Sequence, residues 1–204
     1  LLMYVFFVCG IIYHGQATSV KSLTLDPLFQ IISTITSTGY TVTNFENWGT
    51  FCLALVFALM FFGACAGSTS GGAKIDRMIY LFKNCRNEID RCIHPNNIYT
   101  VRVNGKVVSS DLVSKVIAFL CLYVIIIMVG GIVLTGFGLP LVDSFFSAFS
   151  CISNTGLGAG VTGYGGSYEI VPDAGKWLLA LIMLIGRLEL FTVLIIFSRT
   201  FWRK

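Results

Sequence analysis

The sequence predicts an all-α integral membrane protein built from two tandem repeats, each with an outer helix, a short re-entrant helix and an inner helix. Of the 204 residues, 55% are hydrophobic and only 12% are charged, and the mean hydropathy is +0.82. Ordinary soluble domains carry about 25% charged residues, so this composition disfavours a soluble enzyme. Four apolar stretches run along the chain, and two of the segments between them repeat one another.

The four apolar stretches cover residues 1–13, 51–67, 116–135 and 177–197. A helix that spans a bilayer needs about 20 mainly apolar residues, and the last two stretches have that length. The first stretch starts inside an apolar run, without an initiator Met or the pattern of a signal peptide. We therefore expect the chain to be a fragment of a longer protein, with its first outer helix truncated.

Two shorter segments, residues 26–39 and 143–156, align with each other at an offset of 117 residues. Both are rich in Phe, Ile, Ser and Thr, and both are too short to cross a bilayer, so each is predicted to be re-entrant. The identical pairs are Asp26 with Asp143, Phe29 with Phe146, Ser33 with Ser150, Ile35 with Ile152, Thr38 with Thr155, and Gly39 with Gly156. This internal repeat divides the chain into two units, residues 1–108 and 109–204.

The distribution of charge predicts the orientation in the membrane. Basic residues are concentrated in the connector between the units and after the last span, so both are expected to be cytoplasmic by the positive-inside rule. The connector's basic residues are Lys74, Arg77, Lys83, Arg86, Arg91, Arg102, Lys106 and Lys115. Acidic residues are interspersed among them, which favours a solvated juxtamembrane segment over a lipid or nucleic-acid patch. Asn104-Gly105, flanked by valines, predicts a small hairpin there.

Each re-entrant segment ends in a Thr-Gly turn: the first turn is residues 36–41 and the second turn is residues 153–157. Irregular backbone is tolerated at membrane depth only where it is buried in protein or lines a water-filled path. Glycine reaches backbone angles that other residues avoid, and a helix C-terminus carries partial negative charge. Both turns are therefore predicted to coordinate a cation through carbonyl and hydroxyl oxygens. For one turn alone, the alternative is a helix-capping turn at the protein surface. The presence of the same turn in both repeats disfavours this alternative.

Two further features are predicted to line the same path. The glycine-rich loop, residues 63–72, contains four glycines and three hydroxyl side chains, a composition that does not form a stable helix in lipid. In the last span, Arg187 lies about 15 Å along the helix from Trp177, at about 1.5 Å per residue. A charge near the middle of the bilayer is costly and indicates a functional residue. An ion pair with another helix is the structural alternative for Arg187.

Three motifs resemble the C-terminal half of the Trk/Ktr/HKT superfamily of potassium transporters. They are Ser-Thr-Gly-Tyr-Thr at residues 37–41, Gly-Ser-Thr-Ser-Gly-Gly at residues 67–72, and Gly-Arg-Leu-Glu-Leu-Phe-Thr at residues 186–192 with Phe-Trp-Arg at residues 201–203. The resemblance extends over essentially the whole chain. It implies four repeats of outer helix, re-entrant pore helix and inner helix around one pore, as in potassium-channel-like transporters. This chain would supply the third and fourth repeats.

The resemblance also implies roles for particular residues. Two quarters of a selectivity filter would come from Thr36, Ser37, Thr38, Gly39, Tyr40, Ser153, Asn154, Thr155, Gly156 and Leu157. K⁺ would bind at Ser37, Thr38, Asn154 and Thr155. A gate would be formed by Gly63, Gly67, Ser68, Thr69, Ser70, Gly71, Gly72 and Arg187.

The function that the resemblance implies is potassium uptake across the cell inner or plasma membrane, with K⁺ as the transported ion, no organic cofactor and no enzymatic activity. Symport with a second ion is a further expectation. The expected partners are membrane lipid, the N-terminal half of the same protein, a second copy in a homodimer and a cytosolic nucleotide-binding TrkA-like subunit, but no nucleic acid. Two alternatives are a two-repeat cation-channel subunit that dimerises and a non-transporting membrane scaffold or sensor.

Overall fold

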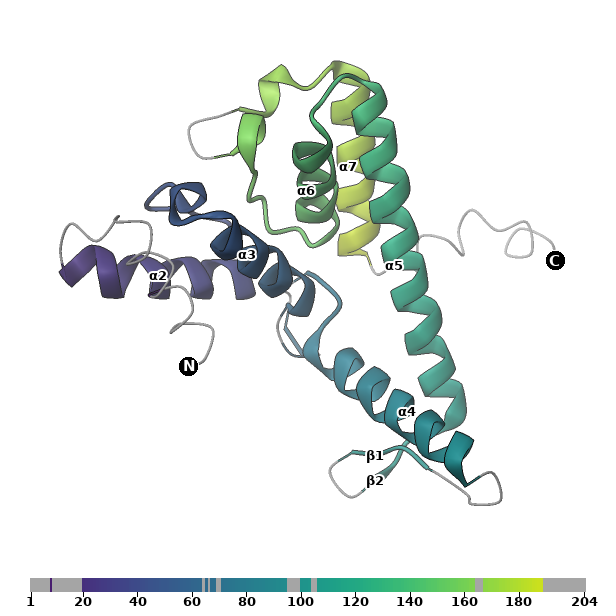
Figure 1. Cartoon of the computed structure of the whole chain (residues 1–204). Helices are drawn as coiled ribbons and strands as arrows, with labels where there is room; N and C mark the ends of the chain where they lie inside the picture. Colours follow the sequence, from purple (N-terminus) through teal and green to yellow (C-terminus); the bar gives the residue numbers. More distant parts are fainter. Residues whose placement is uncertain are drawn as a thin grey trace.

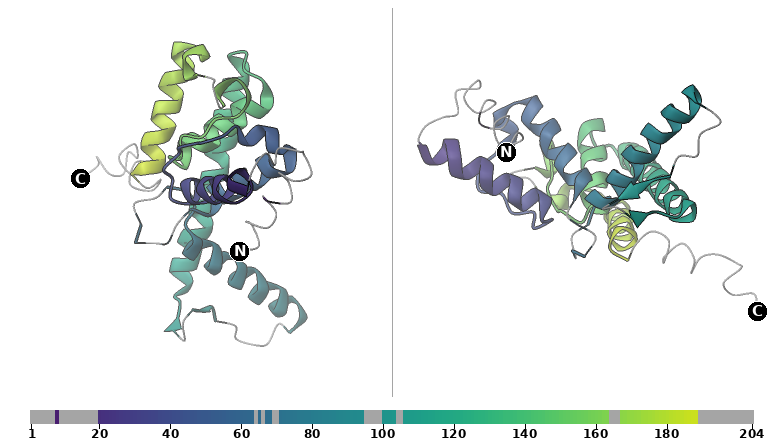
Figure 2. Two further views of the ribbon diagram at one scale, coloured as in Figure 1. Left: turned by 90° about the vertical axis from the view of Figure 1, so that its left-hand side faces the viewer. Right: turned by 90° about the horizontal axis from the view of Figure 1, so that it is seen from below.

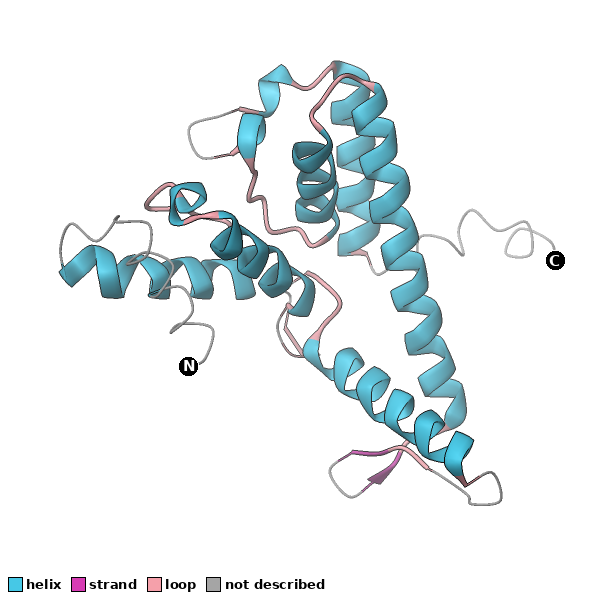
Figure 3. Ribbon diagram, viewed as in Figure 1, coloured by secondary structure: helices cyan, strands magenta, loops and turns pink. Residues whose placement is uncertain are grey.

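The computed structural model describes residues 20–63, 65, 67–68, 71–94, 100–103, 106–163 and 167–188, together with residue 8. Within these residues the chain is helical apart from one small hairpin and the connecting loops (Figure 3). The predicted all-α architecture is therefore confirmed. The predicted first outer helix, residues 1–13, lies outside the described residues except for residue 8.

The first repeat is built around two helices, α2 (Val20–Ile35) and α3 (Thr50–Phe62), which pack against each other (Figure 1). The 3₁₀ helix η1 (Phe45–Trp48) leads into α3 and packs on it. The inner helix ends at Phe62, where the glycine-rich loop, residues 63–72, was expected to begin. The cause is Gly63, which adopts φ 58°, a left-handed conformation that an α-helix does not accommodate.

The connector contains a helix that the charge pattern did not lead us to expect. Helix α4 (Ile75–Ile93) runs away from the helical bundle and packs against the part of α5 (Ser110–Gly136) nearest to it in the chain (Figure 1). The Arg77 guanidinium lies 3.9 Å from the centre of the Phe119 ring, a cation–π contact between the two helices. The connector is therefore a packed element as well as a charged one.

The expected hairpin is present as two short antiparallel strands, β1 (Arg102–Val103) and β2 (Lys106–Val107). Arg102 pairs with Val107 and Val103 pairs with Lys106. This register leaves residues 104 and 105 as a two-residue connection, as the Asn-Gly pair predicts, and these two residues lie outside the described set.

The second repeat consists of three helices packed side by side, α5, α6 (Leu141–Ile152) and α7 (Asp173–Arg187), as two orthogonal views show (Figures 1 and 2). Helix α5 contains the predicted span 116–135 and is the one helix among the described residues that is long and apolar enough to cross a membrane. Gly130 lies close to α7, since a Cβ there would lie 2.7 Å from the Cδ1 of Ile182. The predicted last span continues beyond α7, where residues 189–204 are outside the described set.

The two repeats share one aromatic core. The Phe57 ring of α3 stacks on Phe149 of α6 with 4.2 Å between ring centres. Tyr123 of α5 contacts both Phe149 and Phe61, at 6.2 Å and 5.8 Å between ring centres. Each aromatic pair stabilises the packing by about 0.5–1.5 kcal/mol beyond the area it buries. Helix α3 of the first repeat is thereby fixed against α6 of the second repeat.

Candidate functional site

The first turn follows α2 directly and folds back on the last turn of that helix. Ser37 and Gly39 adopt left-handed backbone conformations, with φ of 55° and 77°. The Thr38 N–H donates to the Ser33 carbonyl over 2.9 Å. A left-handed conformation has little steric cost for glycine but costs about 1–2 kcal/mol for a residue with a Cβ. The conformation of Ser37 is thus imposed by the contacts around the turn.

The second turn reproduces this backbone after α6. Asn154 and Gly156 are left-handed, with φ of 53° and 84°. The Thr155 N–H donates to the Ser150 carbonyl over 3.1 Å. Each of these residues stands 117 positions after its counterpart in the first turn. The internal repeat therefore extends from residue identities to the conformation of the main chain.

Each turn also holds a pair of hydroxyl groups. Thr36 Oγ1 and Thr38 Oγ1 lie 2.7 Å apart in the first turn, and Ser153 Oγ and Thr155 Oγ1 lie 2.9 Å apart in the second. The second pair is buried and the first is exposed. The difference arises because α6 is packed between other helices of the described structure, whereas α2 packs mainly on α3.

The two turns meet, although 117 residues separate them in the sequence. Gly39 faces the main chain of the second turn so closely that a Cβ at Gly39 would overlap the Thr155 carbonyl oxygen. The same Cβ would lie 3.7 Å from the Cα of Gly156. The structure thus brings together the two sets of residues that the sequence predicts to coordinate a cation.

This arrangement offers the chemistry of a cation site. Two helices end at the same place, and the C-terminal end of each helix carries partial negative charge. Backbone carbonyls and hydroxyls are the oxygen ligands that replace the hydration shell of K⁺ in selectivity filters. The predicted K⁺ ligands Ser37, Thr38, Asn154 and Thr155 all belong to the two turns. Among the other predicted filter residues, the side chain of Tyr40 is exposed and that of Leu157 is buried.

The glycine-rich loop begins and ends at one place. A Cβ on Gly63 would lie 2.6 Å from the Gly71 carbonyl oxygen, and the Ala73 N–H donates to the Phe61 carbonyl over 3.1 Å. The positive φ of Gly63 and of Gly72 allows the chain to leave α3 and return to it. Gly67 and Ser68 lie within the loop, and the predicted gate residues Thr69 and Ser70 are outside the described residues.

The glycine-rich loop contacts the second turn through Gly71. A Cβ on Gly71 would overlap the Ser153 carbonyl oxygen and lie 3.3 Å from the Cβ of Asn154. The loop is therefore pressed against the main chain of a predicted cation-binding turn, without space for a side chain between them.

The end of α7 holds the second turn from another side. The Asn154 side-chain amide donates to the Met183 carbonyl over 3.2 Å, and a Cβ on Gly186 would overlap the Ile152 carbonyl oxygen. Arg187, the next residue, is the exposed last residue of α7. Both predicted gate elements, the glycine-rich loop and the region of Arg187, thus lie beside the same turn.

Two carboxylates that were not among the predicted site residues hold the loop that follows the second turn. Glu46 Oε1 accepts the Gly160 N–H over 2.7 Å, and Asp143 Oδ2 accepts the Val161 N–H over 2.9 Å. Both contacts are made to η2 (Gly160–Thr162). Asp143 was recognisable in the sequence as a repeat identity, whereas no sequence signal indicates a partner for Glu46 that lies 114 residues away.

A group of hydroxyls lies behind the second turn. Ser147 Oγ and Thr162 Oγ1 lie 3.1 Å apart and connect α6 with η2. Tyr168, in the 3₁₀ helix η3 (Tyr168–Ile170), lies in the same loop. Burial raises the pKa of the Tyr168 phenol, as does Cys151 nearby, and the neighbouring hydroxyls of Ser147, Ser150 and Thr162 oppose this shift. The phenol therefore stays protonated at neutral pH.

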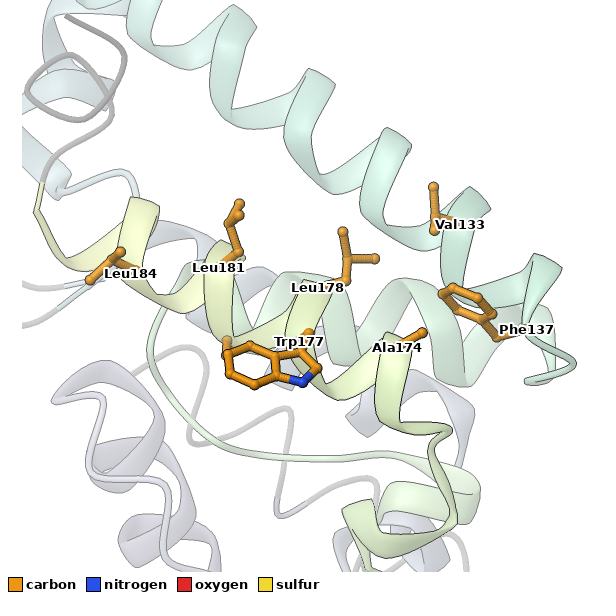
Figure 4. A pocket seen from close by; sticks show the side chains of 8 residues that line it. Val133, Phe137, Ala174, Trp177, Leu178, Leu181 and Leu184 are labelled. Carbon is orange, nitrogen blue, oxygen red and sulfur yellow. The ribbon is translucent and has the colours of Figure 1, made fainter. Parts of the chain in front are cut away.

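A groove of about 630 Å³ runs between α5 and the exposed face of α7 (Figure 4). The Trp177 ring, 79% exposed, lies over one side of it. Its lining consists of Val133, Phe137, Ala174, Trp177, Leu178, Ala180, Leu181 and Leu184. These side chains are apolar, so they offer no ligands for a cation.

Comparison with known proteins points to one family. Residues 3–204 match the profile of TrkH, described as a cation transport protein. The Trk system potassium uptake protein TrkH of Escherichia coli strain K12 is 31% identical over 192 residues, covering 94% of this chain and 39% of that protein. The Vibrio parahaemolyticus protein of the same name is 34% identical over 201 residues, covering 98% of this chain and 41% of that protein.

A solved structure shows the same similarity in three dimensions. The crystal structure of the potassium transporter TrkH from Vibrio parahaemolyticus superposes with a TM-score of 0.88 and 33% sequence identity, covering 99% of this chain and 43% of that one. The helical membrane-protein fold predicted from the sequence is thereby confirmed. The chain spans about two-fifths of the length of the relatives that it matches.

Proposed function

Because this chain belongs to the TrkH family of cation transport proteins, we propose that it forms part of a membrane pore through which potassium ions enter the cell. Two of its relatives are named potassium uptake proteins. The observation that carries the proposal is the meeting of the two turns at Gly39 and Thr155, in matching backbone conformations. A turn that only capped a surface helix would have no reason to pair with its repeat counterpart.

In the proposed mechanism, a K⁺ ion exchanges hydrating water for oxygens of the two turns and moves inward along the membrane potential. The left-handed residues Ser37 and Asn154 and the glycines Gly39 and Gly156 set the direction of the intervening carbonyls. The C-terminal ends of α2 and α6 favour a cation electrostatically at this point. Two turns supply two sides of a filter, so the remaining sides would come from further repeats.

We assign the gate to the glycine-rich loop and to Arg187. The contact of Gly71 with Ser153 supports this assignment, since a movement of the loop would be transmitted directly to the second turn. A Cβ on Gly186 would lie 3.0 Å from the Asn154 side-chain amide, so the residue before Arg187 lies against the same turn. A guanidinium near the path repels cations, so Arg187 would act as an electrostatic barrier to K⁺.

The partners in this proposal follow from the family. The relatives are more than twice as long as this chain, so we propose that the other sides of the filter come from an N-terminal half of the same protein. A homodimer in membrane lipid, a cytosolic TrkA-like nucleotide-binding subunit and coupling to a second ion complete the proposal. In this arrangement the connector with α4 faces the cytoplasm, where its basic residues are expected.

The proposal is tested by uptake of radioactive Rb⁺ into K⁺-starved cells that lack their own potassium uptake systems and express the full-length protein. We expect uptake that excess K⁺ suppresses and excess Na⁺ does not. Gly39→Ser and Gly156→Ser should abolish uptake or alter this preference. Gly136→Ser is the matched control, because a Cβ on Gly136 meets no described atom within 4 Å and its φ is not positive.

The possible outcomes separate the alternatives. An unchanged preference for K⁺ over Na⁺ in both filter-glycine variants would overturn the assignment of the filter. Selective uptake by residues 1–204 alone would favour a two-repeat subunit that dimerises. Correctly inserted full-length protein that transports no Rb⁺, even with the regulatory subunit, would favour a scaffold or sensor.

A further inference from the structure

One side chain of α2 determines where a carbonyl of the first turn points. Ser33 Oγ donates to the carbonyl oxygen of Tyr40 over 2.7 Å. Ser33 is only 4% exposed, so the hydroxyl that donates this hydrogen bond is shielded from water. The Ser33 carbonyl also accepts the N–H groups of Thr38 and Gly39, at 2.9 Å and 3.4 Å. A single residue therefore holds three consecutive residues of the first turn.

The counterpart in the second repeat does not make this bond. Ser150 stands 117 positions later and is fully buried, and its carbonyl accepts the Thr155 N–H just as Ser33 accepts that of Thr38. The Ser150 hydroxyl, however, has no hydrogen-bond partner among the described residues. It lies near the Tyr168 phenol, whose oxygen is likewise unpartnered among them. The Leu157 carbonyl, which corresponds to that of Tyr40, is therefore not held by Ser150.

This asymmetry affects the ligands available to an ion. A carbonyl that accepts a hydrogen bond from a buried side chain of the preceding helix is directed toward that helix. A carbonyl that coordinates an ion must be directed toward the path. A neutral hydrogen bond of this kind contributes a net stabilisation equivalent to about a fivefold change in an equilibrium constant.

We propose that Ser33 is a positioning residue that turns the Tyr40 carbonyl away from the ion path, so that the two repeats contribute unequal sets of oxygen ligands. The inference rests on the proposed function, because it concerns cation discrimination at the same two turns. Ser33 touches no ion itself and acts through the main chain of Thr38, Gly39 and Tyr40. The level of the filter formed by Tyr40 and Leu157 then has one ligand fewer from the first repeat than from the second.

The test compares Ser33→Ala with Ser150→Ala in the full-length protein, using Rb⁺ uptake with K⁺ or Na⁺ as competitor. Both substitutions remove a buried hydroxyl at equivalent places, but only the first breaks a hydrogen bond to the turn. We expect Ser33→Ala to change the ratio of K⁺ to Na⁺ competition by about fivefold. Ser150→Ala should stay within about twofold of the unmodified protein on the same scale, and Ser33→Thr, which keeps a hydroxyl, should restore most of the preference.

A second readout separates this inference from the proposed function. The purified full-length protein should melt at a higher temperature in K⁺ than in Na⁺ of equal ionic strength, since a ligand that binds the folded state stabilises it. Ser33→Ala should reduce this difference while Ser150→Ala keeps it. Equal effects of the two variants, or none from Ser33→Ala, would overturn the role of Ser33. Absence of K⁺-specific uptake and K⁺-specific stabilisation in the unmodified protein would instead overturn the proposed function, and with it this inference.

Discussion

Gly39 lies against the main chain of Thr155 with no room for a side chain between them. The contact joins two turns that occupy equivalent positions in two repeats. Each turn carries the same alternation of left-handed residues, Ser37 and Gly39 in the first and Asn154 and Gly156 in the second. Gly39 therefore needs glycine both for its backbone conformation and for lack of space. Gly156 needs glycine only for its backbone conformation, because a Cβ there would meet no described atom within 4 Å.

This difference predicts unequal effects of Gly39→Ala and Gly156→Ala. Alanine at position 39 meets both a left-handed φ of 77° and the Thr155 carbonyl, whereas alanine at position 156 meets a φ of 84° and no described atom within 4 Å. The backbone cost alone is about 1–2 kcal/mol. We expect Gly39→Ala to lower both the melting temperature and Rb⁺ uptake more than Gly156→Ala. Equal losses of stability in the two variants would contradict a special contact at Gly39.

Gly71→Ala should disturb the second turn without changing any residue of it. Its Cβ would overlap the Ser153 carbonyl oxygen, and overpacking of a close contact typically costs about 1–3 kcal/mol. We expect reduced Rb⁺ uptake at unchanged membrane expression. Gly136→Ala, with open space around the new methyl group, serves as the control and should behave like the unmodified protein. Normal uptake by Gly71→Ala would show that the loop moves aside without affecting the turn.

Glu46 is predicted to connect the first repeat with the loop that follows the second turn. Glu46→Ala removes the acceptor for the Gly160 N–H, while Glu46→Gln keeps an oxygen there. A hydrogen bond at this exposed position contributes about 1 kcal/mol. We expect a lower melting temperature for Glu46→Ala and a smaller decrease for Glu46→Gln. If both variants melt like the unmodified protein at low and at physiological salt, the contact contributes nothing to stability.

Arg187→Ala tests the proposed electrostatic barrier. Removal of the guanidinium should raise the rate of Rb⁺ uptake several-fold, because a positive charge near the path disfavours entry of a cation. Arg187→Lys keeps the charge and should leave the rate close to that of the unmodified protein. A structural role predicts the opposite pattern, with unchanged flux in correctly folded Arg187→Ala or loss of folding in both variants.

The repeat could be recognised in the sequence because its identical residues fall within two short segments. The pairs Thr38/Thr155 and Gly39/Gly156 stand at a fixed offset, and the structure confirms matching backbone conformations at these positions. The span 116–135 was likewise predictable, since an uncharged apolar run of that length is typical of a helix that crosses a bilayer. Roles in filtering and gating cannot be derived from such patterns alone, because the patterns do not specify where an ion is bound or stopped.

Contacts between segments that are distant in the chain could not be predicted from the sequence. Nothing in the sequence indicates that Gly71 packs on Ser153 or that Glu46 accepts a hydrogen bond from Gly160, because each partner is set by the tertiary fold. Helix α4 was missed for a different reason. Its apolar residues recur at intervals of three and four, as in an amphipathic helix, but the high charge of the connector favoured the interpretation as a solvated segment.

Asn154 combines two roles that substitutions can separate. Its φ of 53° suits asparagine and glycine better than alanine, and its side-chain amide donates to the Met183 carbonyl over 3.2 Å. Asn154→Gly keeps the backbone conformation and loses the hydrogen bond, which costs about 1 kcal/mol. Asn154→Ala loses both and adds about 1–2 kcal/mol of backbone strain. If the backbone conformation dominates, Asn154→Gly retains more K⁺-dependent thermal stabilisation and more selective uptake than Asn154→Ala. If the hydrogen bond to Met183 dominates, the two variants lose selectivity to the same extent. The second turn then depends on this hydrogen bond to α7 more than on the left-handed conformation of Asn154.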